Sequence, residues 1–164
     1  MLLYIIRHAW AGEFGDPRWP NDDERPLTGE GRERFACMVE TLAKRGFAPQ
    51  AIATSPLLRC RQTAEIAARH LKRSPPVESL DALRPSSDLA VALEWACRQA
   101  GTCSEVAWVG HSPDVNEMAA ALIGDQGALV RFAKGAVAAV AFDGLPVPTR
   151  GELKWLVTAK VLGC

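Results

Sequence analysis

The run Leu2-Leu3-Tyr4-Ile5-Ile6-Arg7-His8 decides the fold class of this chain. Five apolar residues follow one another without a polar interruption, and Arg7 and His8 then end the run. A continuous apolar run is typical of a strand buried on both faces, as in a parallel sheet, whereas a strand with one wet face alternates. The sequence therefore predicts a buried strand over residues 2–6 that ends in two polar side chains.

The same unit recurs further along the chain. Short apolar runs at residues 51–53 and 106–109 are each followed by a Ser-Pro pair, Ser55-Pro56 and Ser112-Pro113. Serine is a good helix N-cap and proline suits the first helical position, so both pairs predict helix starts. Apolar periodicity and turn residues predict further helices at 28–46 and 87–100, a minor strand at 77, strands at 136–142 and 153–158, and a long loop at 10–27.

Strand and helix alternate over most of the 164 residues, which predicts an α/β protein. We expect a single-domain three-layer sandwich in which helices flank a mainly parallel central sheet. The sequence contains no linker, internal repeat or low-complexity segment, so residues 1–164 are expected to form one domain.

Charge composition excludes some classes of partner. The chain has 19 Lys and Arg residues against 19 Asp and Glu residues, a formal net charge of zero. Proteins that hold nucleic acid or anionic membranes usually present a broad basic face. We therefore expect neither nucleic acid nor membrane as a partner, and the composition makes no prediction about oligomeric state.

The cysteines predict a reducing compartment. Five cysteines are an odd number, they form no C-x-x-C pair, and none has zinc-finger spacing from a histidine. The apolar run at residues 2–6 is also too short for a secretion signal. We expect reduced thiols in a cytoplasmic protein.

Three predicted strands end in polar residues that have no evident role in a core. These junctions are Arg7-His8, Thr54-Ser55 and His111-Ser112. In an open α/β sheet, ligands bind beyond the carboxyl ends of the strands, so the three junctions can face one crevice. Two of them lead into helix starts, which favour anions, and Arg59 lies about one turn inside one of those helices. This combination of arginines, histidines and helix starts predicts a phosphate site.

Each of these residues also has a purely structural interpretation. Arg7-His8 can be a polar strand end, a single histidine such as His111 is more often structural, and an arginine such as Arg59 is usually solvated. Their joint placement at one sheet edge favours the functional interpretation. For His70, near the end of an Arg-rich helix turn, the structural interpretation is the better one.

Four segments resemble the motifs of a known family, in the family's order. Arg7-His8-Ala9 resembles the R-H-G signature of the histidine phosphatase superfamily. Residues 25–31 resemble the R-P-L-T-x-x-G segment of its small SixA-type phosphohistidine phosphatase branch. Residues 55–64 resemble the S-P-x-x-R-x-x-Q-T block, and residues 109–113 resemble the late V-x-H-x-P block.

The resemblance implies a phosphoglycerate-mutase-like fold and a metal-independent phosphatase. It implies that His8 is the nucleophile that accepts the phosphoryl group and that Arg7, Arg59 and His111 surround the phosphate oxygens. Arg25 and Ser112 are further candidates for substrate binding. No cofactor or metal is expected, because the sequence has only three histidines and no metal-binding motif.

Two departures from the family pattern bear on the substrate. Ala9 replaces the glycine of R-H-G, a change that the backbone tolerates if φ is negative there. Leu83-Arg84-Pro85 carries no acid where the mutase branch has Leu-x-Glu. A site without a dedicated acid suits a leaving group such as the nitrogen of phosphohistidine, on a protein or in a small phosphoramidate. The alternatives are a general small-molecule phosphomonoesterase of the same superfamily and a non-catalytic phosphate-binding module.

The 10–27 loop leaves two alternatives open. Its Trp10, Trp19 and acidic run 22–24 can contact a histidine-phosphorylated partner protein, or the loop can be merely solvated. Arg25 can lie beside the phosphate or pair with the acidic run. We expect the acidic residues to lie away from the site, many of them on helices and in the 22–24 run.

Overall fold

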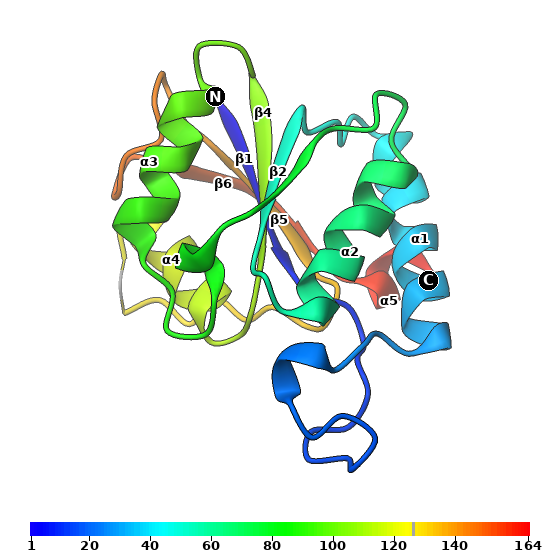
Figure 1. Ribbon diagram of the computed structural model, residues 1–164. Helices are drawn as coiled ribbons and strands as arrows, with labels where there is room; N and C mark the ends of the chain where they lie inside the picture. Colours follow the sequence, from blue (N-terminus) through cyan, green and yellow to red (C-terminus); the bar gives the residue numbers. More distant parts are fainter. Residues whose placement is uncertain (126) are drawn as a thin grey trace.

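A computed structural model describes residues 1–125 and 127–164, and they contain one six-stranded mixed sheet (Figure 1). The order of the strands across the sheet is β3-β2-β4-β1-β5-β6. Their bounds are β1 Leu2–Arg7, β2 Ala51–Thr54, β3 Val77–Ser79, β4 Glu105–Gly110, β5 Val137–Ala141 and β6 Glu152–Val157.

The predicted parallel character holds for the first four strands across the sheet. β3, β2, β4 and β1 run parallel, whereas β5 is antiparallel to β1 and β6 is antiparallel to β5. The chain from β5 to β6 contains only a turn region, and a short connection of this kind joins antiparallel neighbours. The sheet is therefore mainly parallel with two antiparallel strands at one edge.

Helices cover both faces of the sheet (Figure 1). One face carries α1 Gly29–Ala43, α2 Leu58–Arg69 and the short α5 Ala159–Leu162, and the other carries α3 Leu89–Gln99 and α4 Asp114–Ile123. Successive residues of β1 serve opposite cores: Leu3 and Ile5 belong to the core beneath α3 and α4, and Tyr4 and Ile6 to the core beneath α1 and α2. The predicted three-layer α/β sandwich is confirmed, and the alternating burial explains the continuous apolar run.

The helix starts predicted at the two Ser-Pro pairs are displaced. α2 has Leu57 at its N-cap and α4 has Pro113, and in this described part of the chain neither cap makes a side-chain hydrogen bond to its helix. Ser55 Oγ accepts a hydrogen bond of 3.4 Å from the Leu57 amide, but α2 begins only at Leu58, and the same Oγ lies 2.8 Å from Nε2 of His111. The Ser55 hydroxyl, which predicted a helix cap, thus contacts the histidine that follows β4.

The ends of α1 match the prediction in part. Thr28 is the N-cap, and its Oγ1 accepts a hydrogen bond of 3.0 Å from the Gly31 amide. A Cβ on Gly31 would collide with the carbonyl oxygen of Trp10, which explains the glycine in this segment. Gly46 is not the C-cap: the helix ends at Ala43, and Gly46 makes the left-handed turn that follows, with φ of 99°.

The prediction that all five cysteines are reduced is wrong for two of them. α5 packs on α1 and brings Cys164 to Cys37, and the two residues form a disulfide across a Cα–Cα distance of 5.9 Å. Cys60, Cys97 and Cys103 are free. No pattern in the sequence predicted α5, so nothing indicated that Cys164 returns to the first helix.

None of the helices in residues 1–125 and 127–164 is long and apolar enough to cross a membrane. The cytoplasmic location stays a prediction.

Candidate active site

The three polar strand ends meet at one edge of the sheet. β1 lies beside β4, with Arg7 opposite Gly110, and β4 lies beside β2, with Val109 opposite Thr54. Beyond these strand ends lies a cleft of about 720 Å³. All six residues predicted for the site line it: Arg7, His8, Arg25, Arg59, His111 and Ser112.

His8 is buried and carries a neutral ring. Its Nδ1 lies 2.8 Å from the carbonyl oxygen of Ala9, which can only accept a hydrogen bond, so Nδ1 holds the proton and Nε2 has the free lone pair. Burial lowers the pKa of His8 to about 3, and the charges of Arg59 and Arg7 contribute to the same direction. The ring is therefore a neutral base with an available nitrogen at ordinary pH.

Backbone contacts fix the position of His8. Its amide donates to the Gly110 carbonyl over 3.0 Å, and its own carbonyl accepts from the Gly135 amide over 3.1 Å. The next amide, that of Ala9, donates to Thr63 Oγ1 over 3.0 Å. Ala9 does not have a positive φ, so the condition for replacing glycine is met. Thr63, the threonine of the S-P-x-x-R-x-x-Q-T block, thus anchors the strand end that carries His8.

Arg7 and Arg59 both line the cleft, and each has one buried donor. Arg7 donates from Nη1 to the Phe132 carbonyl over 2.7 Å, and Arg59 donates from Nη1 to the Asp22 carbonyl over 2.9 Å. Among the described residues, the buried Nε atoms of both arginines have no hydrogen-bond partner. Buried donors without an acceptor are rare and costly. Two of them beside His8 indicate that an anion completes this site.

His111 lies across the cleft from His8, with 5.4 Å between the ring centroids. Its Nε2 is 2.8 Å from Ser55 Oγ and 3.4 Å from Cys60 Sγ. Burial and, to a smaller extent, the charge of Arg59 together lower the pKa of His111 to about 4. His111 is therefore also a neutral ring, and it is held by Ser55 and Cys60 of the S-P-x-x-R-x-x-Q-T block.

Arg25 pairs with the acidic run, because its Nε lies 2.7 Å from Asp22 Oδ1. The same residue also lines the cleft, and its position beside a phosphate stays a prediction. Ser112 lines the cleft too, and its hydroxyl donates to Asn116 Oδ1 over 3.4 Å.

Several residues of the cleft were not predicted from the sequence. Asp22, in the short 3-10 helix Asp22–Glu24, reaches the guanidinium groups of both Arg25 and Arg59. Glu117 and Asp114 line the cleft from the first turn of α4, and Lys134 lines it from the segment before β5. The expectation that the acidic residues lie away from the site is wrong for Asp22, Asp114 and Glu117. Asp114 follows His111-Ser112-Pro113 directly, and Glu117 lies three residues further on. This closeness to a predicted site histidine was the sequence feature that could have identified both residues.

The stretch at residues 83–85 supplies no carboxylate. Leu83 is buried, and Arg84 forms surface ion pairs with Asp81 at 3.0 Å and Asp23 at 2.9 Å. Within residues 1–125 and 127–164 there is also no group of three His, Cys, Asp or Glu side chains placed to hold a metal ion.

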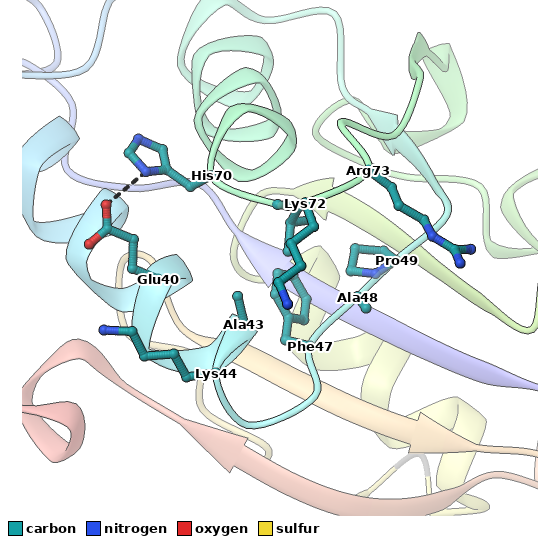
Figure 2. A pocket seen from close by; sticks show the side chains of 10 residues that line it. Glu40, Ala43, Lys44, Phe47, Ala48, Pro49, His70, Lys72 and Arg73 are labelled. Carbon is teal, nitrogen blue, oxygen red and sulfur yellow. Dashed lines mark hydrogen bonds and ion pairs between the residues drawn. The ribbon is translucent and has the colours of Figure 1, made fainter.

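His70 lies in a different hollow, of about 620 Å³, between the ends of α1 and α2 (Figure 2). Its Nδ1 is 2.9 Å from Glu40 Oε1, an ion pair if the ring is protonated. Lys44 and Lys72 at the rim follow the ends of α1 and α2, where cations stabilise the carbonyl ends of helices. This agrees with a structural role for His70.

Sequence comparison agrees with the geometry of the cleft. The profile of the histidine phosphatase superfamily (branch 1) matches residues 3–87, more than half of the chain. This protein belongs to the histidine phosphatase superfamily. It is accordingly a phosphatase, and its fold is that of the phosphoglycerate-mutase-like members.

The chain also resembles a relative in sequence and solved phosphatases in structure. An uncharacterised protein from a Picosynechococcus species is 40% identical over 124 residues, which are 74% of this chain and 73% of that protein. The structure of the protein histidine phosphatase SixA complexed with tungstate superposes with a TM-score of 0.83, at 25% identity and 99% coverage of both chains. The alpha-ribazole phosphatase from Shigella flexneri superposes with a TM-score of 0.69, at 16% identity and 97% coverage of both chains. Phosphatases named for different substrates thus share this fold.

Proposed function

We propose that this histidine phosphatase hydrolyses phosphohistidine, on a protein or as a small phosphoramidate, through a phosphorylated His8 intermediate. The observation that carries the proposal is the pair of unpartnered Nε donors of Arg7 and Arg59 beside the free Nε2 of His8. Two fixed cations around a neutral imidazole form a site for a phosphoryl group. The likeness to SixA supports the choice of phosphohistidine as substrate.

In the first step, the Nε2 lone pair of His8 attacks phosphorus and the bond from phosphorus to the substrate nitrogen breaks. The departing imidazole keeps the electron pair of that bond and takes up a proton from solvent. Arg7 and Arg59 stabilise the charge on the equatorial oxygens during transfer. His8 can attack because its ring is neutral, and its Nδ1–H bond to Ala9 spreads the positive charge that develops on the ring.

In the second step, water attacks the phosphorus of phosphorylated His8. The bond from phosphorus to Nε2 breaks, its electron pair returns to the ring, and the water proton is released to solvent. Inorganic phosphate leaves and His8 is again neutral. Each step exchanges one bond to phosphorus for another, so the cycle consumes water and needs no other reactant.

A second candidate function, hydrolysis of small phosphate esters, is favoured by one observation. Glu117 lines the cleft, and a carboxylic acid there can protonate an oxygen leaving group, which an ester requires more than a phosphoramidate does. This is the general phosphomonoesterase alternative.

The test offers phosphohistidine-bearing protein, phosphohistidine amino acid and sugar phosphates to the wild type and to Glu117→Gln. The proposal expects kcat/KM to be highest for a phosphohistidine substrate and to be nearly unchanged for it in the variant. Comparable turnover of sugar phosphates, lost in Glu117→Gln, would instead establish the esterase alternative.

A further inference from the structure

The Asp22 carboxylate joins two cleft arginines. Its Oδ1 accepts from Arg25 Nε over 2.7 Å, and its Oδ2 lies 3.1 Å from Arg59 Nη2. The backbone carbonyl of the same residue accepts from Arg59 Nη1 over 2.9 Å. Asp22 therefore binds Arg59 through two atoms, one of the main chain and one of the side chain.

These contacts occupy one end of the Arg59 guanidinium. A guanidinium has five N–H donors in a rigid plane, and its two terminal nitrogens together form one edge while Nε and one terminal nitrogen form another. Asp22 binds both terminal nitrogens, and the buried Nε is the donor that remains without a partner. The free edge is thus the one that contains Nε, and its geometry suits a two-oxygen contact with a phosphoryl group.

The chain around Asp22 is itself fixed. Asn21 caps the 3-10 helix by accepting from the Asp23 amide over 3.1 Å, and Arg25 donates from Nη1 to the Gly12 carbonyl over 2.9 Å. In Figure 1 this 3-10 helix lies beyond the carboxyl end of β1, in the loop that follows that strand. The main-chain carbonyl that holds Arg59 therefore has a defined position.

Arg59 could not keep this orientation alone. Its side chain is only 5% exposed, so water cannot orient the guanidinium, and the neighbouring Arg25 repels it. Of the acidic side chains in the described residues, Asp22 is the one that forms an ion pair with it. Without that carboxylate, the guanidinium would lose both its charge compensation and half of its clamp.

We propose that Asp22 is a positioning residue that clamps the terminal nitrogens of Arg59 and thereby presents the Nε edge of Arg59 to the phosphoryl group. The inference rests on the proposed function, because it assigns Arg59 to the transferred phosphoryl group. It differs from the opposite role, in which the Asp22 carboxylate competes with phosphate for Arg59.

The experiment compares Asp22→Asn with the matched control Asp23→Asn. Asp23 is the next residue of the same 3-10 helix and pairs with Arg84 on the surface. The control therefore removes a carboxylate and its ion pair without changing a residue that lines the cleft. We measure kcat and KM on an artificial aryl phosphate, and the affinity for inorganic vanadate by calorimetry. Asp22→Asn is expected to lower kcat by about 10- to 100-fold and to weaken vanadate binding by about 10-fold, because the guanidinium loses its alignment. Asp23→Asn is expected to change either quantity by less than about two-fold.

A double-mutant cycle separates positioning from general loss of structure. If Asp22 acts through Arg59, then adding Asp22→Asn to Arg59→Ala costs no further activity, whereas loss of the fold would cost more in both backgrounds. Tighter vanadate binding in Asp22→Asn would establish competition and overturn the inference, as would an equal loss in Asp23→Asn. If the wild type binds vanadate but hydrolyses neither phosphohistidine nor esters, the proposed function fails, and the vanadate affinities of the two variants still decide the role of Asp22.

Discussion

The neutral state of His8 and His111 makes a measurable prediction about stability. Both rings are buried and have pKa values of about 3 and about 4 in the folded chain, against 6.5 for an exposed histidine. As pH falls below 6.5, the unfolded chain binds two protons that the folded chain does not bind. Stability is therefore lost from pH 6.5 downward, and the loss levels off below the folded pKa values.

The size of this loss follows from the two shifts. At pH 4.5 both histidines are mostly neutral in the folded chain and about 99% protonated when unfolded, which costs about 2 to 3 kcal/mol for each ring. Together the two rings remove about 5 kcal/mol between pH 7.5 and pH 4.5, a large share of the stability of an ordinary domain.

Urea unfolding at several pH values between 7.5 and 4.5 measures this slope. His8→Asn and His111→Asn should each reduce the pH-dependent loss by about half, because each removes one of the two protons bound on unfolding. His70→Asn is the control, since His70 lies outside the cleft and its ring contacts Glu40 at the surface. A His8→Asn variant with the wild-type slope would refute the reasoning, because His8 would then bind as many protons in the folded chain as in the unfolded chain.

The remaining predictions concern catalysis and the disulfide. His8→Ala should abolish hydrolysis of an aryl phosphate while circular dichroism shows a folded chain; retained turnover would eliminate His8 as the nucleophile. Arg59→Ala should lower kcat by about 100- to 1000-fold, the usual effect of removing one charged or oxyanion donor, and a near-normal kcat would contradict its role. The bond between Cys37 and Cys164 spans 127 residues, so its reduction should lower the free energy of unfolding by up to about 5 kcal/mol. Thiol titration of the unfolded, unreduced chain should detect three thiols, whereas five would contradict the disulfide. Cys103→Ser, which removes a free thiol, should leave the midpoint of urea unfolding unchanged.

Much of the fold and the centre of the site could be predicted because both depend on local patterns and one topological rule. The run at residues 2–6 is buried on both faces, and a strand with that burial belongs to the middle of an α/β sheet. Since parallel strands end at the same edge, Arg7-His8 and His111 could be expected at one sheet edge, and the pairing of β1 with β4 makes them neighbours.

The parts that failed depend on contacts between segments far apart in the sequence. Ser55 has the chemistry of an N-cap, but its hydroxyl bonds His111, 56 residues away, and the helix starts later. Cys37 and Cys164 meet only because a four-residue helix packs on α1. Asp22 appeared to belong to a solvated acidic run until the folded loop brought it to Arg59. In each case a local propensity was overridden by a partner that no local pattern contains.

The zero net charge of the chain conceals how the cleft controls charge. Burial removes water from Arg7, Arg59, His8 and His111 alike, but the consequences for the two residue types differ. The guanidinium groups stay charged because their ordinary pKa is far above neutrality, even though burial lowers it. The imidazoles, whose ordinary pKa is near neutrality, lose their protons under the same burial and beside the same cations. One environment thus produces both a cationic site for a phosphoryl group and a neutral nitrogen that can attack it, and Asp22 compensates one of those cations without occupying its Nε edge.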